Sequence, residues 1–486
     1  MIQVLKTSRL QLSISLFLGF LVLLILFSNI KGILFNCFHA YDFGIYQQGI
    51  FNIAGGESLN PMITVRGLKA FNDHFMPVIL LAVPFAWISN LHPVSLIVFE
   101  WMWFALFLFL VFKELKKREF EKPLILYSLG LIIFSKGILT GLEFPIHPGT
   151  WSLPIWFLLF LNIEKDKCKK MMFFGIALCM FRGTYPFAVF MLGLYFLGTR
   201  KHPITGFVLS GFSAVYSYFV YILRPRILGE TASYGGNYFK GYLENPIEAS
   251  ITLFKTFEYA GFLKVFLPVI LVLGFIAYKE KNNLKWTDWR IPALLTISPI
   301  FAVHFLTNKF HYHYGAAFLA PLLTICFLSD GYKQILKNKR FAAIVMIAFI
   351  ATASGRYTKF FNTFVLSKSK KCRFDSKYAE ETGLIVEKIN QLYKGKKIVA
   401  SGGIIQRVMK PGIQIYAPNT MTTPPENFDL LLLLRNKAGD TYPWHKEHVE
   451  KAIKSCKKHE NEVLFESEYY YLASGQFNRS CLSVWP

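Results

Sequence analysis

The sequence lacks the short motifs that mark nucleotide-driven and hydrolytic enzymes. It contains no Walker loop, no GxSxG nucleophile elbow and no HExxH zinc site, which argues against ATP-driven or hydrolytic chemistry. Its seven cysteines include no CxxC pair and no metal-ligand spacing. The chain is also poor in acidic residues, with 30 Asp and Glu against 53 Lys and Arg and a formal charge of +23. We detect no internal repeat and no low-complexity segment, so hydropathy has to decide the fold class.

The positive charge is concentrated in short loops between apolar blocks. These loops read KELKKREFEK, EKDKCKK, GTRKHP, YKEKNNLKWTDWR and GYKQILKNKR. Basic clusters of this kind are what the positive-inside rule predicts for the cytoplasmic face of a membrane protein. The charge therefore does not indicate a nucleic-acid partner, and the lipid bilayer is the partner that we expect.

Long apolar blocks are the dominant feature of the chain, which is 53% hydrophobic and 17% aromatic over 486 residues. Blocks of about 17 to 22 residues exceed what a soluble core needs, and each can cross a bilayer. The first block, residues 11–30, is too long for the apolar core of a signal peptide, and no small-residue cleavage site follows it. We expect it to remain as an anchor of a multi-pass protein of the inner (cytoplasmic) membrane.

The basic loops also predict the topology. With the basic N-terminus inside, the first block leads the chain out. The apolar stretch 75–91 is short and contains Pro77 and Pro84. If it crossed, every later basic loop would lie outside, so we expect that it does not complete a crossing. This threading predicts about eleven transmembrane helices, at residues 11–30, 94–113, 123–140, 151–163, 171–181, 186–199, 203–223, 258–278, 290–306, 314–330 and 340–356.

After residue 357 the apolar blocks stop. KKIVAS, IQIYAP, FDLLLLL and NEVLFESEYYYLAS are typical of strands, and YAEETGLIVEKINQLY and HKEHVEKAIKSCKKHE of amphipathic helices. We therefore predict a transmembrane domain over residues 1–357 and a small α/β domain over residues 358–486, which the threading places outside. An oxidising compartment would allow, without requiring, a disulfide between Cys456 and Cys481 in this tail.

The threading places Asp42 at the outer end of the first span. The aromatic side chains of Tyr41 and Tyr46 would shield this carboxylate from water, and an acid held in this way can accept a proton from a hydroxyl or bind a divalent cation. The neighbouring amides of Gln47 and Gln48 suit sugar hydroxyls. An ordinary loop acid or helix N-cap is the alternative interpretation of Asp42.

Other polar residues fall in the same outer loops. Asp73 and His74 could form an orienting dyad, half of a metal site or a helix cap. The remaining candidates are Glu143, His147, Arg182, Arg224, Arg226, Lys309, His311, His313 and Tyr314. An interfacial aromatic belt would explain the tyrosines but not the histidines. The cations contradict the positive-inside pattern on this face, and a phosphate ligand would account for them.

Three blocks resemble, in order and spacing, the signature of a family of predicted membrane proteins, domain of unknown function 2079, which is thought to be related to GT-C glycosyltransferases. The blocks read YDFGIYQQGIFNIAGGE, NDHFMPVILLAVPFAWI and HYHYGAAFLAPLL. The resemblance covers most of the chain. It implies a GT-C-like polytopic enzyme that takes sugar from a polyprenyl-phosphate carrier, with Asp42 as the key acid. Asp73 and His74 match the second block, and His313 and Tyr314 the third.

Two stretches depart from the family pattern. RGTYP stands where an acidic pair is expected, and RVMKPGIQIY where a His-containing motif is expected. If those residues are catalytic in the family, this member is altered or inactive. The leading hypothesis is a membrane glycosyltransferase that acts on an extracytoplasmic acceptor, with Asp42 as base or metal ligand. The alternatives are a permease or lipid flippase, which would need polar groups deep inside the spans, and a non-catalytic envelope protein.

Overall fold

The computed structural model describes most of the chain. The described residues are 8–37, 40–73, 75–144, 146–228, 242, 244–280, 285–308, 312–368, 373–417, 425–435, 438, 446–458 and 461–482. Within these ranges the side chains at 8, 40–42, 73, 228, 312, 313 and 446 are not described. The chain folds into two compact units, and each is described by itself. The first comprises Met1–Leu23, His74–Val78 and Glu100–Tyr357, and the second Leu24–Asp73, Ile79–Phe99 and Thr358–Pro486.

The division differs from the predicted one in its N-terminal part. The second unit resumes at Thr358, which is the predicted domain boundary. However, it also includes Leu24–Asp73 and Ile79–Phe99, which the sequence assigned to the membrane domain. Hydropathy could not reveal this, because the grouping depends on packing between segments more than 300 residues apart.

Every predicted span overlaps at least one helix, and the span at 123–140 is divided between two. The helices are α1 (Ser8–Leu34), α5 (Val94–Lys117), α6 (Lys122–Ile133), α7 (Lys136–Glu143), α9 (Leu153–Glu164), α10 (Cys168–Cys179), α11 (Tyr185–Thr199), α12 (Pro203–Tyr218), α16 (Tyr259–Glu280), α17 (Arg290–Leu306), α18 (Ala316–Leu328) and α19 (Lys339–Phe364). Among the described residues, 5 helical segments are long and apolar enough to cross a membrane, or 6 if the pair α6 and α7, bent by 53°, forms one span. The length and apolar composition of these helices therefore indicate a multi-pass membrane protein.

Shorter elements connect these helices in the first unit. They are α8 (Pro148–Trp151), a π-helical turn at Phe219–Leu223, α13 (Arg224–Leu228), α15 (Pro246–Thr256) and the 3-10 turns Tyr312–Gly315 and Asp330–Lys337. Proline occupies one of the first two positions of α6, α8, α9, α11 and α12. It is tolerated there because the first amides of a helix have no intrahelical partner. The prolines therefore mark where these helices begin.

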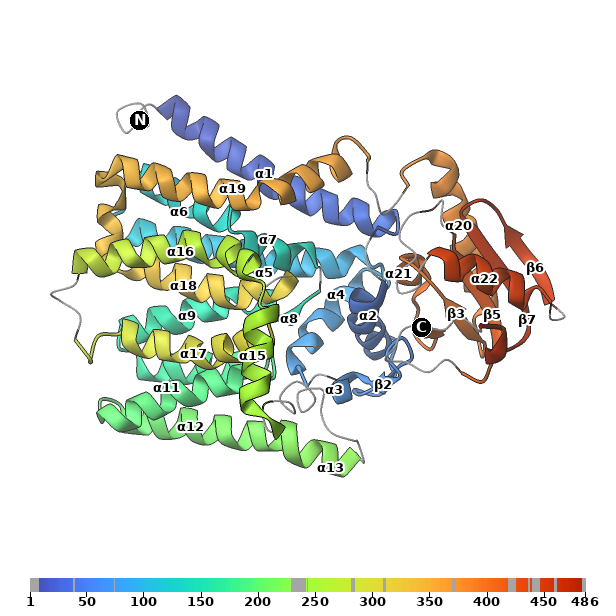
Figure 1. Cartoon of the computed structure of the whole chain (residues 1–486), viewed down its shortest axis with the longest axis horizontal. Coiled ribbons are helices and arrows are strands. Elements are labelled where there is room, and N and C mark those ends of the chain that lie inside the picture. Colours follow the sequence, from blue (N-terminus) through green and yellow to red (C-terminus); the bar gives the residue numbers. More distant parts are fainter. Residues whose placement is uncertain are drawn as a thin grey trace. The chain divides into compact units, whose positions relative to one another are not determined.

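Close backbone approaches hold the helices of the first unit together. Helix α11 packs beside α12 and α17 (Figure 1). A Cβ atom on Gly193 of α11 would lie 2.5 Å from the backbone nitrogen of Ser210 in α12, and one on Gly206 only 2.8 Å from the carbonyl oxygen of Gly193. Small residues at such crossings let helix backbones approach closely, which is the usual packing mode between membrane helices.

The segment 75–91 forms a short helical hairpin arm. It contains a 3-10 turn at Pro77–Ala82 and α4 at Val83–Ile88, and the apolar helix Pro77–Ile88 falls short of the length of a candidate span. Asn90 and Leu91 then adopt positive φ angles and turn the chain. Six 3-10 and six α-helical residues extend about 21 Å, less than the hydrocarbon thickness of about 30 Å. Helices α9 and α10 are equally short, with 12 residues each, so the absence of a crossing at 75–91 stays a prediction.

The second unit contains a five-stranded sheet, formed by the four tail stretches that the sequence predicted as strands. Its strands are β3 (Lys397–Ala400), β4 (Gln414–Tyr416), β5 (Asn427–Leu434), β6 (Asn461–Glu466) and β7 (Tyr470–Asn478), in the order β4-β3-β5-β7-β6. Strand β3 pairs in parallel with β4 and β5, whereas β7 is antiparallel to β5 and β6. The run from Leu430 to Leu434 is at most 2% exposed, as expected for a central strand that is covered on both faces. The stretch NEVLFESEYYYLAS forms a hairpin of two strands.

Helices and further short elements complete the second unit. They are α2 (Ala40–Ala54), β1 (Met62–Ile63), β2 (Leu68–Lys69), α3 (Ala70–Asp73), α20 (Ser376–Leu392), α21 (Ile404–Val408), α22 (Lys446–Cys456) and a 3-10 turn at Arg479–Leu482. The turn after α1 is tied to the sheet by Asn36, whose side-chain amide donates to Tyr378 Oη and Tyr470 Oη at 3.0 Å each. Asn36 is 1% exposed, so these bonds satisfy both donors of a buried side-chain NH2 group.

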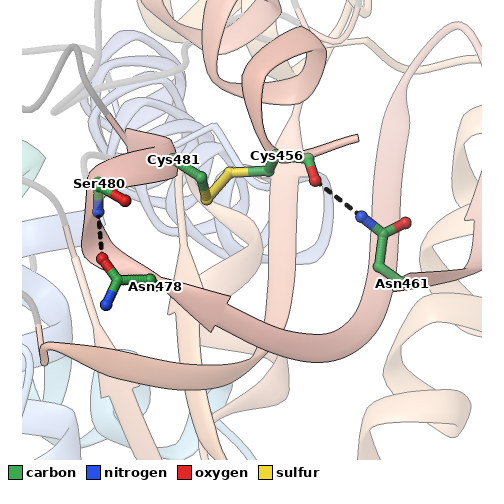
Figure 2. The surroundings of a disulfide bond; sticks show 5 residues. All are labelled: Cys456, Asn461, Asn478, Ser480 and Cys481. Atoms are coloured by element: carbon green, nitrogen blue, oxygen red, sulfur yellow. Dashed lines mark hydrogen bonds between the residues drawn. A yellow bond between two sulfur atoms is a disulfide. The ribbon is translucent and has the colours of Figure 1, made fainter. Parts of the chain in front are cut away.

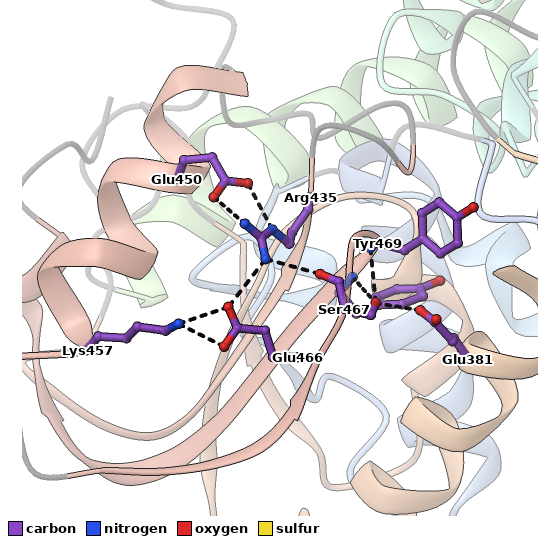
Figure 3. Close-up of polar contacts among 8 residues, drawn as sticks. Glu381, Arg435, Glu450, Lys457, Glu466, Ser467 and Tyr469 are labelled. Carbon is purple, nitrogen blue, oxygen red and sulfur yellow. Dashed lines mark hydrogen bonds and ion pairs between the residues drawn. The ribbon is translucent and has the colours of Figure 1, made fainter. Parts of the chain in front are cut away.

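Charged side chains on the tail domain pair with one another (Figure 3). The Arg435 guanidinium, which follows β5, donates to both oxygens of Glu450 at 3.0 and 2.8 Å. Glu466 accepts from Arg435 at 3.4 Å and from Lys457 at 2.8 Å. Such partly exposed pairs contribute little to stability. They also satisfy the guanidinium of Arg435 at the carboxyl end of β5.

A disulfide joins Cys456, the last residue of α22, to Cys481 in the turn after β7, with 4.8 Å between their Cα atoms (Figure 2). This confirms that the bridge the sequence allowed is formed. Cys37 is disulfide-bonded as well, and its partner lies outside the described residues. Cys168, Cys179 and Cys326 are free, and the last two are fully buried.

Replacing Cys456 by Ser is expected to destabilise the tail domain by about 3 kcal/mol, because a closed loop of this length restricts the unfolded chain. The bridge spans 25 residues and joins a helix to the end of the sheet. The thermal unfolding midpoint of the purified protein measures the effect. Ser480→Ala, which changes an exposed residue beside the bridge, is the matched control and should leave the midpoint unchanged. Equal midpoints for both variants would contradict the prediction.

Candidate functional site

Seven of the predicted site residues lie outside the described residues or side chains. They are Tyr41, Asp42, Asp73, His74, Lys309, His311 and His313. The backbone places Asp42 in the first turn of α2, which begins at Ala40, and Asp73 at the end of α3. The roles predicted for these seven side chains therefore stay predictions.

The structure does not place Gln47 and Gln48 where a sugar could reach them. Both are fully buried in the second unit. The Gln47 amide donates to the carbonyl oxygen of Gln406 at 2.8 Å, and the Gln48 amide donates to Thr64 Oγ1 at 2.9 Å and to the carbonyl oxygen of Ile413 at 3.0 Å. Both glutamines join α2 to the tail domain, so the prediction that they contact substrate is wrong. Tyr46 lies on the same helix and is half-buried.

Three predicted or adjacent polar groups of the first unit converge beside Gly149 of α8. A Cβ atom on Gly149 would lie 3.4 Å from His147 Nδ1, 3.7 Å from Tyr185 Oη and 3.8 Å from Arg182 Nη1. Tyr185 Oη also hydrogen-bonds Ser152 Oγ at 3.1 Å. The side of Gly149 without a side chain thus faces an imidazole, a phenol and a guanidinium. We call His147, Gly149, Arg182 and Tyr185 the Arg182 cluster.

The guanidinium of Arg182 is held by an aromatic ring and has unused hydrogen-bonding capacity. Its Cζ lies 4.9 Å from the ring centroid of Tyr314, a cation–π distance. Nη1 of Arg182 is buried and has no hydrogen-bond partner among the described residues. A buried donor without a partner is costly, so this atom is well placed to bind an acceptor group such as a phosphate oxygen.

The loop that carries His147 is positioned by a carboxylate in α5. Glu100 is completely buried. Its Oε2 accepts the backbone amide of Ile146 at 2.7 Å, and its Oε1 accepts that of His147 at 3.4 Å. Ile146 has a φ of 65°, which is rare for a β-branched residue and costs energy. Glu100 therefore stabilises a strained turn directly beside the Arg182 cluster.

A second arginine, Arg224, lies near the first. It is 7% exposed and follows the π-helical turn Phe219–Leu223. Its guanidinium stands 5.9 Å from the ring centroid of Phe75. Tyr221, within this turn, experiences the charges of both Arg182 and Arg224, and its hydroxyl would lie 2.7 Å from a Cβ on Gly183. Isolated π-helical turns are frequent at functional sites, and this one brings a phenol between two cations.

Glu143 and Arg226 are not part of this arrangement as described. Glu143 is 6% exposed and forms an ion pair with Arg356 of α19. Lys136 experiences the charges of Arg356 and Lys264, so Glu143 partly neutralises a group of cations. A buried carboxylate in an ion pair has a structural role here, and the predicted contact of Glu143 with substrate stays a prediction. Arg226 is exposed on α13.

Sequence reasoning missed three residues that the structure brings to this region, namely Glu100, Tyr185 and Tyr221. Glu100 had a usable signal, because an acid in the middle of an apolar span is a functional or structural site by default. The two tyrosines had none, since tyrosine is common wherever helices meet the membrane interface.

The described side chains include no group of three His, Cys, Asp or Glu residues that could hold a metal ion. Several predicted metal ligands lie outside that set. Whether the protein binds a metal ion therefore depends on Asp42, Asp73 and the undescribed histidines. The described part can bind an anion, since it combines the buried Arg224 and the half-buried Arg182 with phenol and imidazole donors.

Comparison with known proteins gives one family. The model of a family described as "Predicted membrane protein (DUF2079)" matches residues 37–400. The matched region includes the Arg182 cluster and the first strand of the tail domain. No curated protein matches the chain.

Proposed function

Because the chain belongs to this family of predicted membrane proteins, we propose that it is an integral-membrane glycosyltransferase of the GT-C type. It moves a sugar from a polyprenyl-phosphate donor to an acceptor on the extracytoplasmic face. In this proposal the chain crosses the membrane with all eleven helical segments, the shorter ones broken or packed inside the bundle, where protein and not lipid surrounds their ends.

The observation that supports the proposal most strongly is the Arg182 cluster. The buried Nη1 of Arg182, unpaired within the described part of the chain, lies with His147 and Tyr185 around Gly149. Arg182 is close enough to Arg224 for both charges to act on Tyr221. Two guanidinium groups and neutral donors match a phosphate that carries a lipid on one side and a sugar on the other.

The oxidised tail supports the extracytoplasmic location. The Cys456–Cys481 bridge would persist in an oxidising compartment and is unusual in a reducing cytosol. Asp42 would act as base or metal ligand toward the acceptor hydroxyl, and Asp73, His74, His311 and His313 would support it. Arg182, Arg224 and Lys309 would bind the donor phosphate.

Arg182→Gln is expected to weaken binding of farnesyl phosphate, a short polyprenyl phosphate, by about tenfold or more, because a charge-assisted hydrogen bond contributes roughly 1.5–3 kcal/mol. Calorimetric titration of the purified protein in detergent measures the affinity. Arg200→Gln is the matched control, because Arg200 is an exposed arginine at the far end of α11, the helix that begins shortly after Arg182.

Farnesol, which lacks the phosphate, should bind weakly to every form of the protein. Equal affinities for farnesol and farnesyl phosphate, or an unchanged affinity in Arg182→Gln, would contradict a phosphate site at the Arg182 cluster. Binding without any release of sugar from a polyprenyl-phosphate-linked sugar would contradict the transferase and favour a lipid flippase.

A further inference from the structure

The opposite ends of the same helices bring together an acid, an imidazole and a thiol. Asp166 lies in the turn between α9 and α10, Cys168 begins α10, and His202 immediately precedes α12. Cys168 Sγ is 3.3 Å from His202 Nδ1, and His202 Nε2 is 2.6 Å from Asp166 Oδ1. The three side chains thus form a chain of hydrogen bonds in the order thiol, imidazole, carboxylate.

The order of the contacts decides the role of each group. Asp166 is an acceptor when ionised, so it holds the proton of His202 on Nε2 and leaves Nδ1 free to accept the proton of the thiol. This is the relation of nucleophile, base and orienting acid that activates cysteine and serine in unrelated enzymes. In a metal site the three donors would instead converge on one point, and the described residues contain no such group.

Contacts outside the triad hold it in place. Lys201 Nζ is 3.0 Å from Asp166 Oδ1, and the ring of Phe196 packs edge-on to His202 with centroids 5.3 Å apart. Burial raises the pKa of Asp166, but the hydrogen bonds from Lys201 and His202 outweigh it, and the net pKa is below the usual range. Asp166 is therefore ionised at neutral pH and orients His202.

We propose that Cys168, His202 and Asp166 form a nucleophilic triad in which Cys168 accepts an acyl group from an anionic acyl thioester. Exposed cations flank Cys168 in the sequence, namely Lys167, Lys169 and Lys170, and they suit a donor with several phosphates. Cys168 is the first residue of α10. The unpaired backbone amides at this N-terminus would stabilise both a thiolate and an oxyanion.

The neighbouring surface suits the acyl chain. Ile204 and Phe207, which follow His202 on α12, are 76% and 72% exposed, and Phe173 on α10 is 67% exposed. Such apolar side chains face lipid in a membrane protein. An acyl group on Cys168 would begin where the basic loops end and continue along these residues.

The transfer is balanced without a redox step. The Sγ proton of Cys168 moves to His202 Nδ1, and the thiolate attacks the carbonyl carbon of the donor thioester. The tetrahedral intermediate expels the donor thiolate, which takes the proton from His202. The products are an acyl-Cys168 thioester and the free donor thiol, and Asp166 keeps its charge throughout.

The nucleophile can be tested by alkylation with iodoacetamide at pH 6.5, where an ordinary thiol is only about 1% ionised. Cys168 in the full-length protein is expected to react at least tenfold faster than an ordinary thiol at this pH. His202→Asn and Asp166→Asn should each abolish the acceleration. Cys179 and Cys326 are fully buried internal controls that should remain unlabelled. His92→Asn is the matched variant, because His92 also precedes a proline at the start of a helix.

The acyl transfer can be tested by incubating the protein with hexadecanoyl coenzyme A. The expected result is a mass increase of one acyl group that hydroxylamine removes, which is absent in Cys168→Ser and reduced at least tenfold in His202→Asn. A slow reaction with iodoacetamide, unchanged by the His202 and Asp166 variants, would overturn the triad. Fast alkylation without a hydroxylamine-sensitive adduct would overturn acyl transfer.

Discussion

Asp42→Asn is expected to lower the rate of sugar transfer by about a hundredfold or more, since loss of a general base typically has an effect of this size. The amide occupies the same space as the carboxylate but cannot accept a proton or bind a cation strongly. The measurement is the release of sugar from a polyprenyl-phosphate-linked donor by the purified protein.

The position of Asp42 in the helix allows the catalytic and structural interpretations to be separated. Asp42 lies in the first turn of α2, which begins at Ala40, where an acid interacts favourably with the helix dipole by about 0.3–1 kcal/mol. A small decrease in Tm is therefore expected whether or not the residue is catalytic, and only the rate distinguishes the two.

Glu57→Gln makes the same change of acid to amide at an exposed residue just after α2. It should alter neither Tm nor rate. A transfer rate of Asp42→Asn within about threefold of the unmodified protein would contradict the catalytic role and leave Asp42 as a helix-stabilising acid.

Gly403→Ala is expected to destabilise the second unit by about 3 kcal/mol, near the upper end for an overpacked core. A Cβ at Gly403 would lie 2.2 Å from the carbonyl oxygen of Asn36 and 2.6 Å from its carbonyl carbon. Both are backbone atoms, so no side-chain rotation relieves the clash. Gly403 has a φ of −62°, and the effect is therefore one of space and not of backbone conformation.

The effect is large because the clash would displace the turn at Asn36, which forms several buried hydrogen bonds. Asn36 donates to Tyr378 and Tyr470, and the Arg407 guanidinium of α21 donates to the carbonyl oxygen of Leu34. Moving the turn at Asn36 away from α21 would leave these buried groups without partners. Thermal unfolding should show a decrease in Tm of about 10 °C, given about 2–4 °C per kcal/mol for a domain of this size.

The control for Gly403 is another glycine of the same unit. A Cβ added to Gly383, inside α20, would meet no neighbouring segment of the described chain within 4 Å. Gly383→Ala should therefore raise stability by about 0.5–1 kcal/mol through helix propensity. If Gly403→Ala behaved like Gly383→Ala, the close approach between α21 and the turn at Asn36 would be wrong.

The sequence by itself determined the fold class and most element types. Apolar blocks and basic loops predicted a helix at each proposed span, because bilayer crossing requires runs of apolar residues whatever their neighbours. The leucines of FDLLLLL predicted a buried strand for a similar reason, since seven residues are too few to cross and suit a central strand. These features depend only on local composition and length.

Only the tertiary structure decided which polar residues act together. Gln47 and Gln48 resembled open-loop amides in the sequence, but each donates to a carbonyl group more than 350 residues away. Arg182 lies beside Gly149, and Cys168 beside His202, through helix packing that leaves no periodic signal in the chain. The chemistry of a side chain is known from the sequence alone. Which partner a buried polar group bonds depends on the distant segment that the fold brings to it.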